Sequence, residues 1–252
     1  MMASPASAPD IPGRLEAVCE RVASAADRVG RTPASVAVIA VSKGFPAETV
    51  SAAMQAGQVD FAENRVQELR RKADQITGAR WHFVGRLQRN KVRDVVGLAS
   101  LIHSVDRIEL AQDIAERASR TQRLQRVLVQ VNAGDDPAKA GCGVDDAPDL
   151  VGALRQMDGL ACEGLMTIPA QGVDPRPAFA RLRQLRDDLR SQFPEVQHLS
   201  MGMSNDFEVA VEEGATIVRI GEAIFGPRPD PDLQPPAGGS FDQSSALPAG
   251  RT

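Results

Sequence analysis

The chain has 252 residues, enough for one large domain or two small ones, and a (β/α)₈ barrel typically needs about 250. Its 42% hydrophobic and 25% charged residues are ordinary for a globular protein with a substantial core. The net charge is −4 and the Lys and Arg residues are scattered, so no basic field favours DNA or RNA as a partner.

Two segments precede the first expected strand. Residues 1–9 are mostly small and contain proline, so we expect a flexible N-terminus. Over residues 11–29, apolar side chains recur at steps of three and four, which predicts an amphipathic helix. Pro33 then interrupts this pattern.

The rest of the chain alternates between short β-branched runs and helical patterns. The runs typical of strands lie at 36–41, 59–62, 81–84, 101–105, 126–131, 161–168, 198–201 and 216–220. The helical patterns lie at 47–56, 65–76, 91–99, 108–119, 148–157, 177–193 and 206–213. Strands that alternate with helices predict parallel βαβ units, whose right-handed crossovers place the helices outside the sheet.

Eight strand candidates in one series are the number that a closed barrel needs. We therefore predict an α/β fold, a single (β/α)₈ TIM barrel over residues 10–228 with an extra N-terminal helix. An open, doubly wound sheet is the alternative, because eight strands do not by themselves prove closure. Residues 229–252 are rich in Pro, Gly and Ser, and we expect this tail to be disordered.

The three cysteines, Cys19, Cys142 and Cys162, are widely spaced, and no CxxC pair or Cys/His cluster indicates a metal site. The N-terminus has no basic start followed by an apolar run, so we expect no signal peptide. No stretch approaches the roughly 18 apolar residues of a membrane span. We therefore expect a cytoplasmic protein that does not enter membranes.

Polar residues gather at the expected C-terminal ends of the strands, where barrels of this type hold their functional groups. These strand-end residues are Lys43, Glu63, Asn64, Gly85, Asp106, Asn132, Met166, Thr167, Met203, Ser204, Arg219 and Gly221. Lys43 is the most informative, because it follows six apolar residues and Ser42. Partial burial at a barrel mouth lowers the pKa of a lysine, and a neutral amine is what Schiff-base formation requires. The alternative is a lysine that extends from the strand end into solvent.

A phosphate site is expected where the last strand stops. Gly221 separates that strand from a short helical stretch, and unpaired N–H groups at such a point favour an anion. The loops after strands seven and eight are where barrels commonly hold phosphate, and Ser204 supplies a hydroxyl from strand seven. A plain strand–turn–helix connection is the alternative.

Arg219 lies inside the last strand, opposite in direction to Val218 and Ile220. If it faces the barrel interior, it must have a partner or a ligand; the alternative is an outward arginine that pairs with a carboxylate on a helix. The histidine His82 is more typical of a structural than of a catalytic role, and His103 and His198 give no clearer indication. The cations of the loop 85–91 either bind an anionic ligand or are simply exposed to solvent at the start of a helix.

Several motifs in register resemble one family. They are AVSK (40–43), FAEN (61–64), WHFVG (81–85), LQRNK (87–91), GLM (164–166), LSMGMS (199–204), VRIG (218–221) and AIFG (223–226). Together they resemble the pyridoxal 5′-phosphate (PLP) homeostasis proteins, also called the proline synthetase co-transcribed or YggS-like family. The likeness runs from about residue 12 to residue 228 and covers neither terminus.

The resemblance implies a PLP-bound barrel similar to the N-terminal domain of alanine racemase. It implies a monomer with no established catalytic activity, which buffers PLP or delivers it to PLP-dependent apoenzymes. By position, Lys43 corresponds to the Schiff-base lysine, Arg219 to the group that faces the pyridine nitrogen and Asn64 to a neighbour of the ring hydroxyl. The phosphate contacts correspond to Ser204, Gly221 and Glu222, with Ser200 as a weaker candidate.

Two positions depart from the family pattern, which commonly has Thr or Lys after the lysine and Thr or Ser after VRIG. Here these positions hold Gly44 and Glu222. A carboxylate that faced a phosphate would repel it, so we expect Glu222 to offer its backbone N–H and to turn its side chain away.

A slow PLP-dependent amino-acid racemase is the second candidate function. Racemisation needs an acid/base group on each face of the cofactor, and in the racemase one of these is a tyrosine from across a dimer interface. This sequence contains no tyrosine and no second domain to supply one. A cofactor-free Schiff-base aldolase or a sugar-phosphate isomerase shares the lysine and the phosphate site, but it does not predict the full series of motifs.

Overall fold

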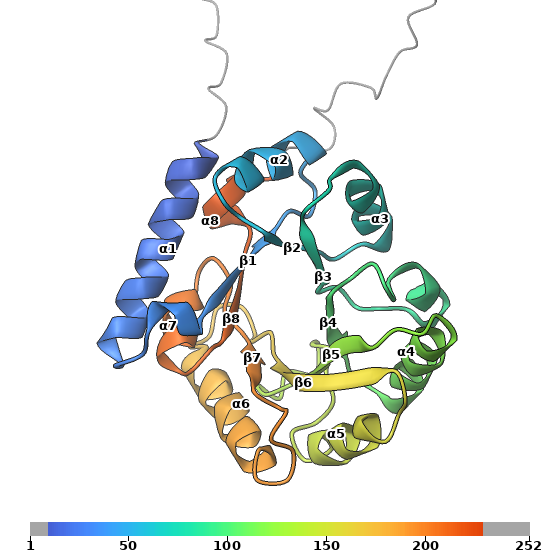
Figure 1. Cartoon of the computed structure of the whole chain (residues 1–252). Helices are drawn as coiled ribbons and strands as arrows, with labels where there is room; N and C mark the ends of the chain where they lie inside the picture. Colours follow the sequence, from blue (N-terminus) through green and yellow to red (C-terminus); the bar gives the residue numbers. More distant parts are fainter. Residues whose placement is uncertain (1–9, 229–252) are drawn as a thin grey trace, which may run out of the picture.

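The computed structural model describes residues 10–228, which form eight parallel strands in a closed barrel, each paired with the next and β8 paired with β1 (Figure 1). The strands are β1 (Ala37–Val41), β2 (Asp60–Glu63), β3 (Arg80–Phe83), β4 (Leu101–Val105), β5 (Gln125–Gln130), β6 (Leu160–Met166), β7 (His198–Ser200) and β8 (Ile217–Ile220). The β8–β1 pairing confirms the predicted TIM barrel and rules out the open, doubly wound sheet.

Helices surround the barrel, as the alternating pattern predicted (Figure 1). They are α1 (Ile11–Arg28), α2 (Ala47–Gln55), α3 (Val66–Gln75), α4 (Ile108–Arg120), α5 (Ala147–Arg155), α6 (Arg176–Leu189), α7 (Phe207–Glu212) and α8 (Glu222–Phe225). Two 3₁₀ helices, η1 (Pro33–Ser35) and η2 (Arg89–Asp94), complete the set.

Helix α1 precedes the first strand and is the predicted extra helix. It lies against α7 and α8 on the outside of the barrel, where its apolar stripe, Leu15, Val18 and Val22 among others, is buried. Its start is capped by Asp10, whose carboxylate accepts a hydrogen bond from the Gly13 N–H at 3.0 Å. On its exposed side, Arg21 pairs with Glu208 of α7.

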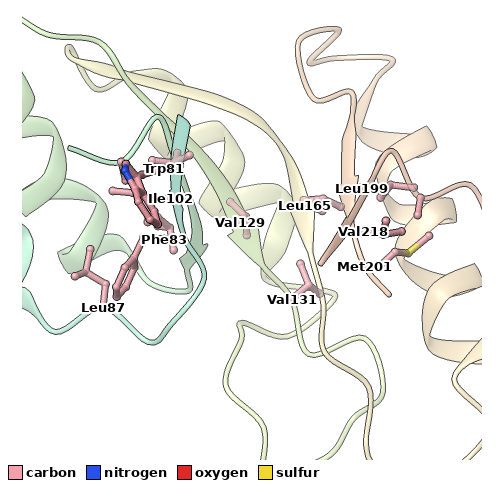
Figure 2. Packing of buried hydrophobic residues seen from close by; sticks show 14 of the residues in the cluster. Trp81, Phe83, Leu87, Ile102, Val129, Val131, Leu165, Leu199, Met201 and Val218 are labelled. Atoms are coloured by element: carbon pink, nitrogen blue, oxygen red, sulfur yellow. The ribbon is translucent and has the colours of Figure 1, made fainter. Parts of the chain in front are cut away.

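Apolar side chains lie on both sides of the strands, because successive residues of a strand point in opposite directions. Inward-pointing residues form a small cluster that includes Ile39, Leu101 and Met166. Outward-pointing residues join the helices in the larger core, part of which is seen in Figure 2. There Trp81 and Phe83 of β3 lie with Ile102 of β4, while Leu199 and Val218 lie at the other side of the view.

The predicted helix at 91–99 is wrong, because the structure has only the 3₁₀ helix η2 there, followed by turns. Val95 and Val96 are β-branched and therefore poor helix formers. Gly97 then adopts a φ of +84°, which breaks any helical path. The other predicted elements are present, with ends shifted by a few residues.

No helix among residues 10–228 is both long enough and apolar enough to span a membrane. The flexible N-terminus expected over residues 1–9 and the disordered tail expected over 229–252 lie outside the described residues.

Strands β6 and β7 approach so closely at Gly164 that no side chain fits there. A Cβ atom on Gly164 would lie 2.1 Å from the His198 carbonyl oxygen of the neighbouring strand. We expect Gly164→Ala to lower the free energy of unfolding by about 3 kcal/mol, because the two strands must separate. Urea denaturation followed by circular dichroism measures this loss.

Gly152→Ala is the matched control, since Gly152 lies in α5 and a Cβ atom there would make an ordinary contact, 3.7 Å from Phe193. This change should raise the free energy of unfolding by up to about 1 kcal/mol through better helix propensity. Equal stability changes in the two variants would contradict the close approach of β6 and β7.

Candidate functional site

The C-terminal ends of the strands form one rim of the barrel, and most of the predicted site residues lie on it. Lys43 follows β1 and Gly221 follows β8, and these two strands are direct neighbours in the sheet (Figure 1). The approach is close, because a Cβ atom on Gly221 would lie 3.2 Å from the Val41 carbonyl oxygen. Asn64 and Ser204 follow β2 and β7 at the same rim, so the structure brings these four positions together.

Lys43 is half-buried and, within residues 10–228, its amine makes neither a hydrogen bond nor an ion pair. Burial lowers the pKa of Lys43, and the nearby guanidinium groups of Arg228 and Arg219 lower it further, while Glu63 opposes them. A larger fraction of this amine is therefore neutral than in an ordinary surface lysine. A neutral amine is a nucleophile, and this one is free of competing partners in the described structure.

A buried ion pair lies directly behind Lys43. Lys72 of α3 and Glu63 of β2 are both fully buried, and the Lys72 Nζ lies 2.5 Å from Glu63 Oε1. Lys72 also donates to the Ser42 carbonyl oxygen at 2.6 Å, and the Ser42 hydroxyl donates to Glu63 at 2.7 Å. These bonds fix the backbone of the residue before Lys43, so the amine leaves the strand from a rigid base.

Glu63 is not fully satisfied by these contacts. Its second oxygen, Oε2, is buried without a hydrogen-bond partner among the described residues. Burial raises the pKa of Glu63, although Lys72 and Ser42 act in the opposite direction. Sequence reasoning placed Glu63 at a strand end but missed Lys72. The available indication was the position of Lys72 on the buried face of α3, in line with Val66 and Leu69.

Arg219 points into the barrel, so it is not the outward arginine, paired with a carboxylate on a helix, that was the alternative. It shares its side of β8 with the inward residue Ile217 and is only 4% exposed. Its guanidinium donates to the Ser200 hydroxyl at 2.7 Å and to the Thr167 carbonyl oxygen at 2.9 Å. Burial lowers the pKa of Arg219 to about 10, with Asp206 opposing, so it stays charged at neutral pH.

Ser200 lies deeper than the other predicted phosphate contacts. Its fully buried hydroxyl accepts the bond from Arg219 and lies 2.8 Å from His103 Nδ1. Its hydrogen-bonding capacity is thus used inside the barrel. The histidines His82 and His103, to which sequence reasoning assigned no site role, are also buried in the interior and are bonded to one another at 3.1 Å.

The rim after β7 and β8 offers several unused donors. The Ser204 hydroxyl oxygen accepts a hydrogen bond from the Ala223 N–H at 3.2 Å, which leaves the hydroxyl hydrogen free to donate. Among the described residues, the N–H groups of Gly221 and Glu222 at the start of α8 donate to no acceptor. Donors that converge without an acceptor form a suitable place for an anionic oxygen.

Comparisons with known proteins agree on one family. The family model of the alanine racemase N-terminal domain matches residues 14–229. A pyridoxal phosphate homeostasis protein from Aquifex aeolicus is 42% identical over 221 residues, which cover 85% of this chain and 97% of that protein. The chain belongs to the family of pyridoxal phosphate homeostasis proteins.

Solved structures extend the comparison. PipY from Synechococcus elongatus, solved with PLP bound, is 34% identical to this family member, with a TM-score of 0.75, and the match covers 86% of this chain and 100% of PipY. Alanine racemase from Corynebacterium glutamicum is 15% identical, with a TM-score of 0.65, over 87% of this chain and 63% of the racemase. The second likeness shows a shared barrel fold only.

The two departures from the family pattern have different structural settings. Gly44 has a φ of +79°, which favours glycine, and its N–H donates to Glu68 Oε2 at 2.7 Å. The turn after Lys43 is therefore tied to α3 by the backbone. Glu222 is exposed, and among residues 10–228 its side chain makes no ion pair.

The buried Glu63–Lys72 pair makes a prediction about stability. Lys72→Met leaves an unpaired buried carboxylate, so we expect the free energy of unfolding at pH 8 to fall by about 3 kcal/mol. Because the folded-state pKa of Glu63 is raised, its protonated form is favoured in the fold, and the loss is smaller at pH 5. Urea denaturation at the two pH values measures the difference.

The control is the double variant Glu63→Gln with Lys72→Met, which has no titrating carboxyl at this position. Relative to it, the single Lys72→Met variant should lose stability as the pH rises from 5 to 8. A constant difference between the two variants would mean that Glu63 does not titrate in this range in the folded protein.

Proposed function

We propose that this protein binds PLP as a Schiff base on Lys43 at the barrel mouth and serves intracellular PLP homeostasis without catalytic turnover. The observation that carries the proposal is the placement of a half-buried, unpaired lysine beside the strand whose end offers free anion donors. Family membership and the PLP-bound structure of PipY support the same cofactor.

The described residues fit PLP in chemistry as well as in position. When bound, PLP supplies an aldehyde that condenses with an amine and releases water. The Lys43 amine has the lowered pKa that this attack needs. Ser204 with the N–H groups of Gly221 and Glu222 offers donors for the phosphate, and the exposed Glu222 side chain leaves that role to its backbone.

Arg219 is proposed to face the pyridine nitrogen, and Asn64 to lie near the ring hydroxyl. A fixed guanidinium beside the ring nitrogen keeps that nitrogen unprotonated, because a second positive charge there is repelled. Arg219 remains charged inside the barrel, which supports this role. An unprotonated ring is a poor electron sink, so the arrangement disfavours carbanion chemistry.

The racemase alternative lacks a group that it needs. Two acid/base residues must flank the cofactor, and the sequence contains no tyrosine to act as the second one. We therefore propose a carrier that passes PLP to apoenzymes and acts as a monomer. The cytoplasm is its proposed compartment, in keeping with the free thiols of Cys19, Cys142 and Cys162.

Lys43→Ala tests the attachment point. Wild-type protein incubated with PLP should show the visible absorption of a Schiff base, and borohydride reduction should fix the label on the peptide that contains Lys43. The variant should lose both signals, because the neighbouring amine, that of Lys72, is fully buried and bonded to Glu63 and to the Ser42 carbonyl oxygen. Visible spectroscopy and peptide mapping by mass spectrometry provide the measurement.

Lys139→Ala is the matched control, since Lys139 lies in the loop that follows β5 at the same rim. It should retain the spectrum and the labelled peptide. An unchanged chromophore in Lys43→Ala, or a label on Lys91 or Lys139, would overturn the assignment of Lys43.

The proposed absence of turnover has its own test. PLP-loaded protein incubated with L-alanine should produce D-alanine no faster than free PLP does, as measured by chiral chromatography. D-alanine formation that is faster than this and that disappears in Lys43→Ala would favour the racemase instead.

A further inference from the structure

A continuous line of hydrogen bonds crosses the inside of the barrel and ends at Arg219. It consists of Asp60 on β2, His82 on β3, His103 on β4, Ser200 on β7 and Arg219 on β8, which we call the interior chain. Asp60 Oδ1 lies 3.0 Å from His82 Nε2, and His82 Nδ1 lies 3.1 Å from His103 Nε2. His103 Nδ1 lies 2.8 Å from the Ser200 hydroxyl, which Arg219 reaches at 2.7 Å.

With one hydrogen on each imidazole ring, the two ends of the interior chain set the direction of the bonds between them. Arg219 can only donate, so the Ser200 oxygen accepts from it and the Ser200 hydrogen is free for His103 Nδ1. The Asp60 carboxylate can only accept, so His82 donates from Nε2. The remaining bond then runs from His103 Nε2–H to His82 Nδ1.

In this arrangement each ring carries one hydrogen, on Nε2. A proton added to Nδ1 of His82 would meet the N–H of His103, and one added to Nδ1 of His103 would displace the Ser200 hydrogen from its acceptor. Burial, together with the charges around it, holds the pKa of His103 well below its usual value, which agrees with this arrangement.

The far end of the interior chain is anchored at the opposite end of the barrel. Asp60 also pairs with Arg80 at the start of β3. Burial alone would raise the pKa of Asp60, but the bonds from Arg80 and His82 hold it well below the ordinary value. Asp60 is thus a permanent carboxylate, and the chain of dipoles runs from this anion to the buried cation Arg219.

We propose that His103 and His82 are positioning residues for the cofactor site, which keep the Ser200 hydroxyl in place as an acceptor and so fix the Arg219 guanidinium. The proposal rests on the proposed function in one respect, that Arg219 is the group facing the pyridine nitrogen. Without His103, the Ser200 hydroxyl is free to rotate, and the Thr167 carbonyl remains the one directed acceptor for Arg219 among the described residues.

A carboxylate near Arg219 can attract its guanidinium once the Ser200 hydroxyl no longer holds it. Asp206 lies close enough for its charge to raise the pKa of Arg219, although within residues 10–228 the two groups form no ion pair. The Asp206 carboxylate is held in place by the Met203 N–H at 2.6 Å. We expect a loosened guanidinium to turn toward this anion and away from the place of the ring.

The first experiment uses wild-type protein without cofactor. Nitrogen-15 NMR of the imidazole rings at pH 7 distinguishes the two neutral forms and the charged form. We expect the resonances of His82 and His103 to show a bare Nδ1 and a protonated Nε2. A protonated Nδ1 on either ring overturns the proposal, whether or not any variant folds.

The second experiment compares His103→Leu with His198→Leu. His198 is a half-buried histidine of β7 that bonds Thr216 and lies outside the interior chain, so its variant controls for loss of a barrel histidine. In wild type and in His198→Leu, the Arg219 guanidinium protons should exchange slowly with water. In His103→Leu they should exchange rapidly, and PLP should bind about tenfold more weakly, the factor typical of one lost hydrogen bond.

The outcomes separate this proposal from the proposed function. Unchanged Arg219 exchange in a folded His103→Leu protein overturns the positioning role, even if PLP binds. If wild type binds no PLP while the ring protonation and the Arg219 exchange are as expected, the proposed function fails and the fixing of Arg219 by the interior chain stands.

Discussion

Strand β8 pairs with β1 in parallel, and this pairing brings the two halves of the site together. Ile39 lies opposite Arg219 in the register, and Ala40 lies opposite Ile220. Since both strands run in the same direction, the chain leaves them at the same rim, so the amine after β1 and the anion donors after β8 are neighbours. In an open sheet the first and last strands need not touch, and these groups would be separated by the width of the sheet.

This barrel buries charge both in its interior and between its strands and helices, where apolar side chains usually pack. Two kinds of contact stabilise these buried charges. The fully buried Lys72 is paired at short range with Glu63, and the pair is further bonded to Ser42. Arg219 instead relies on a hydroxyl, a carbonyl and the interior chain behind the hydroxyl. A carboxylate in contact with Arg219 would cancel its charge, whereas neutral acceptors leave that charge directed at a ligand.

The fold was predictable because hydrophobic periodicity reports it directly. Each strand is a short β-branched run and each crossover is a helical pattern, so the order of elements follows from the sequence. The wrong prediction of a helix at 91–99 was avoidable in part, since Val95, Val96 and Gly97 are poor helix residues. The prediction gave more weight to the apolar spacing of this segment. Closure itself depends on strand tilt and register, which no local pattern encodes.

The rim residues were predictable for a similar reason, because strand ends can be located once the strands are known. The support behind the rim was not. Lys72 is separated from Ser42 by 30 positions, and His103 from Ser200 by 97. Such contacts depend on which strands face one another across the barrel, and a lone histidine or lysine looks the same in the sequence whether it is bonded or free.

Whether a site only holds PLP or also catalyses reactions with it depends on the presence of side chains that can transfer protons. A catalyst needs side chains that can give and take a proton beside the cofactor. Here two of the charged groups near Lys43 already have partners, since Glu63 is bonded to Lys72 and Ser42, and Arg219 is bonded to Ser200 and Thr167. The histidines of the interior lie behind Arg219, with both ring nitrogens in use. Lys43, by contrast, keeps an amine without a partner among the described residues. A half-buried reactive amine with rigid surroundings is suited to reversible attachment of an aldehyde.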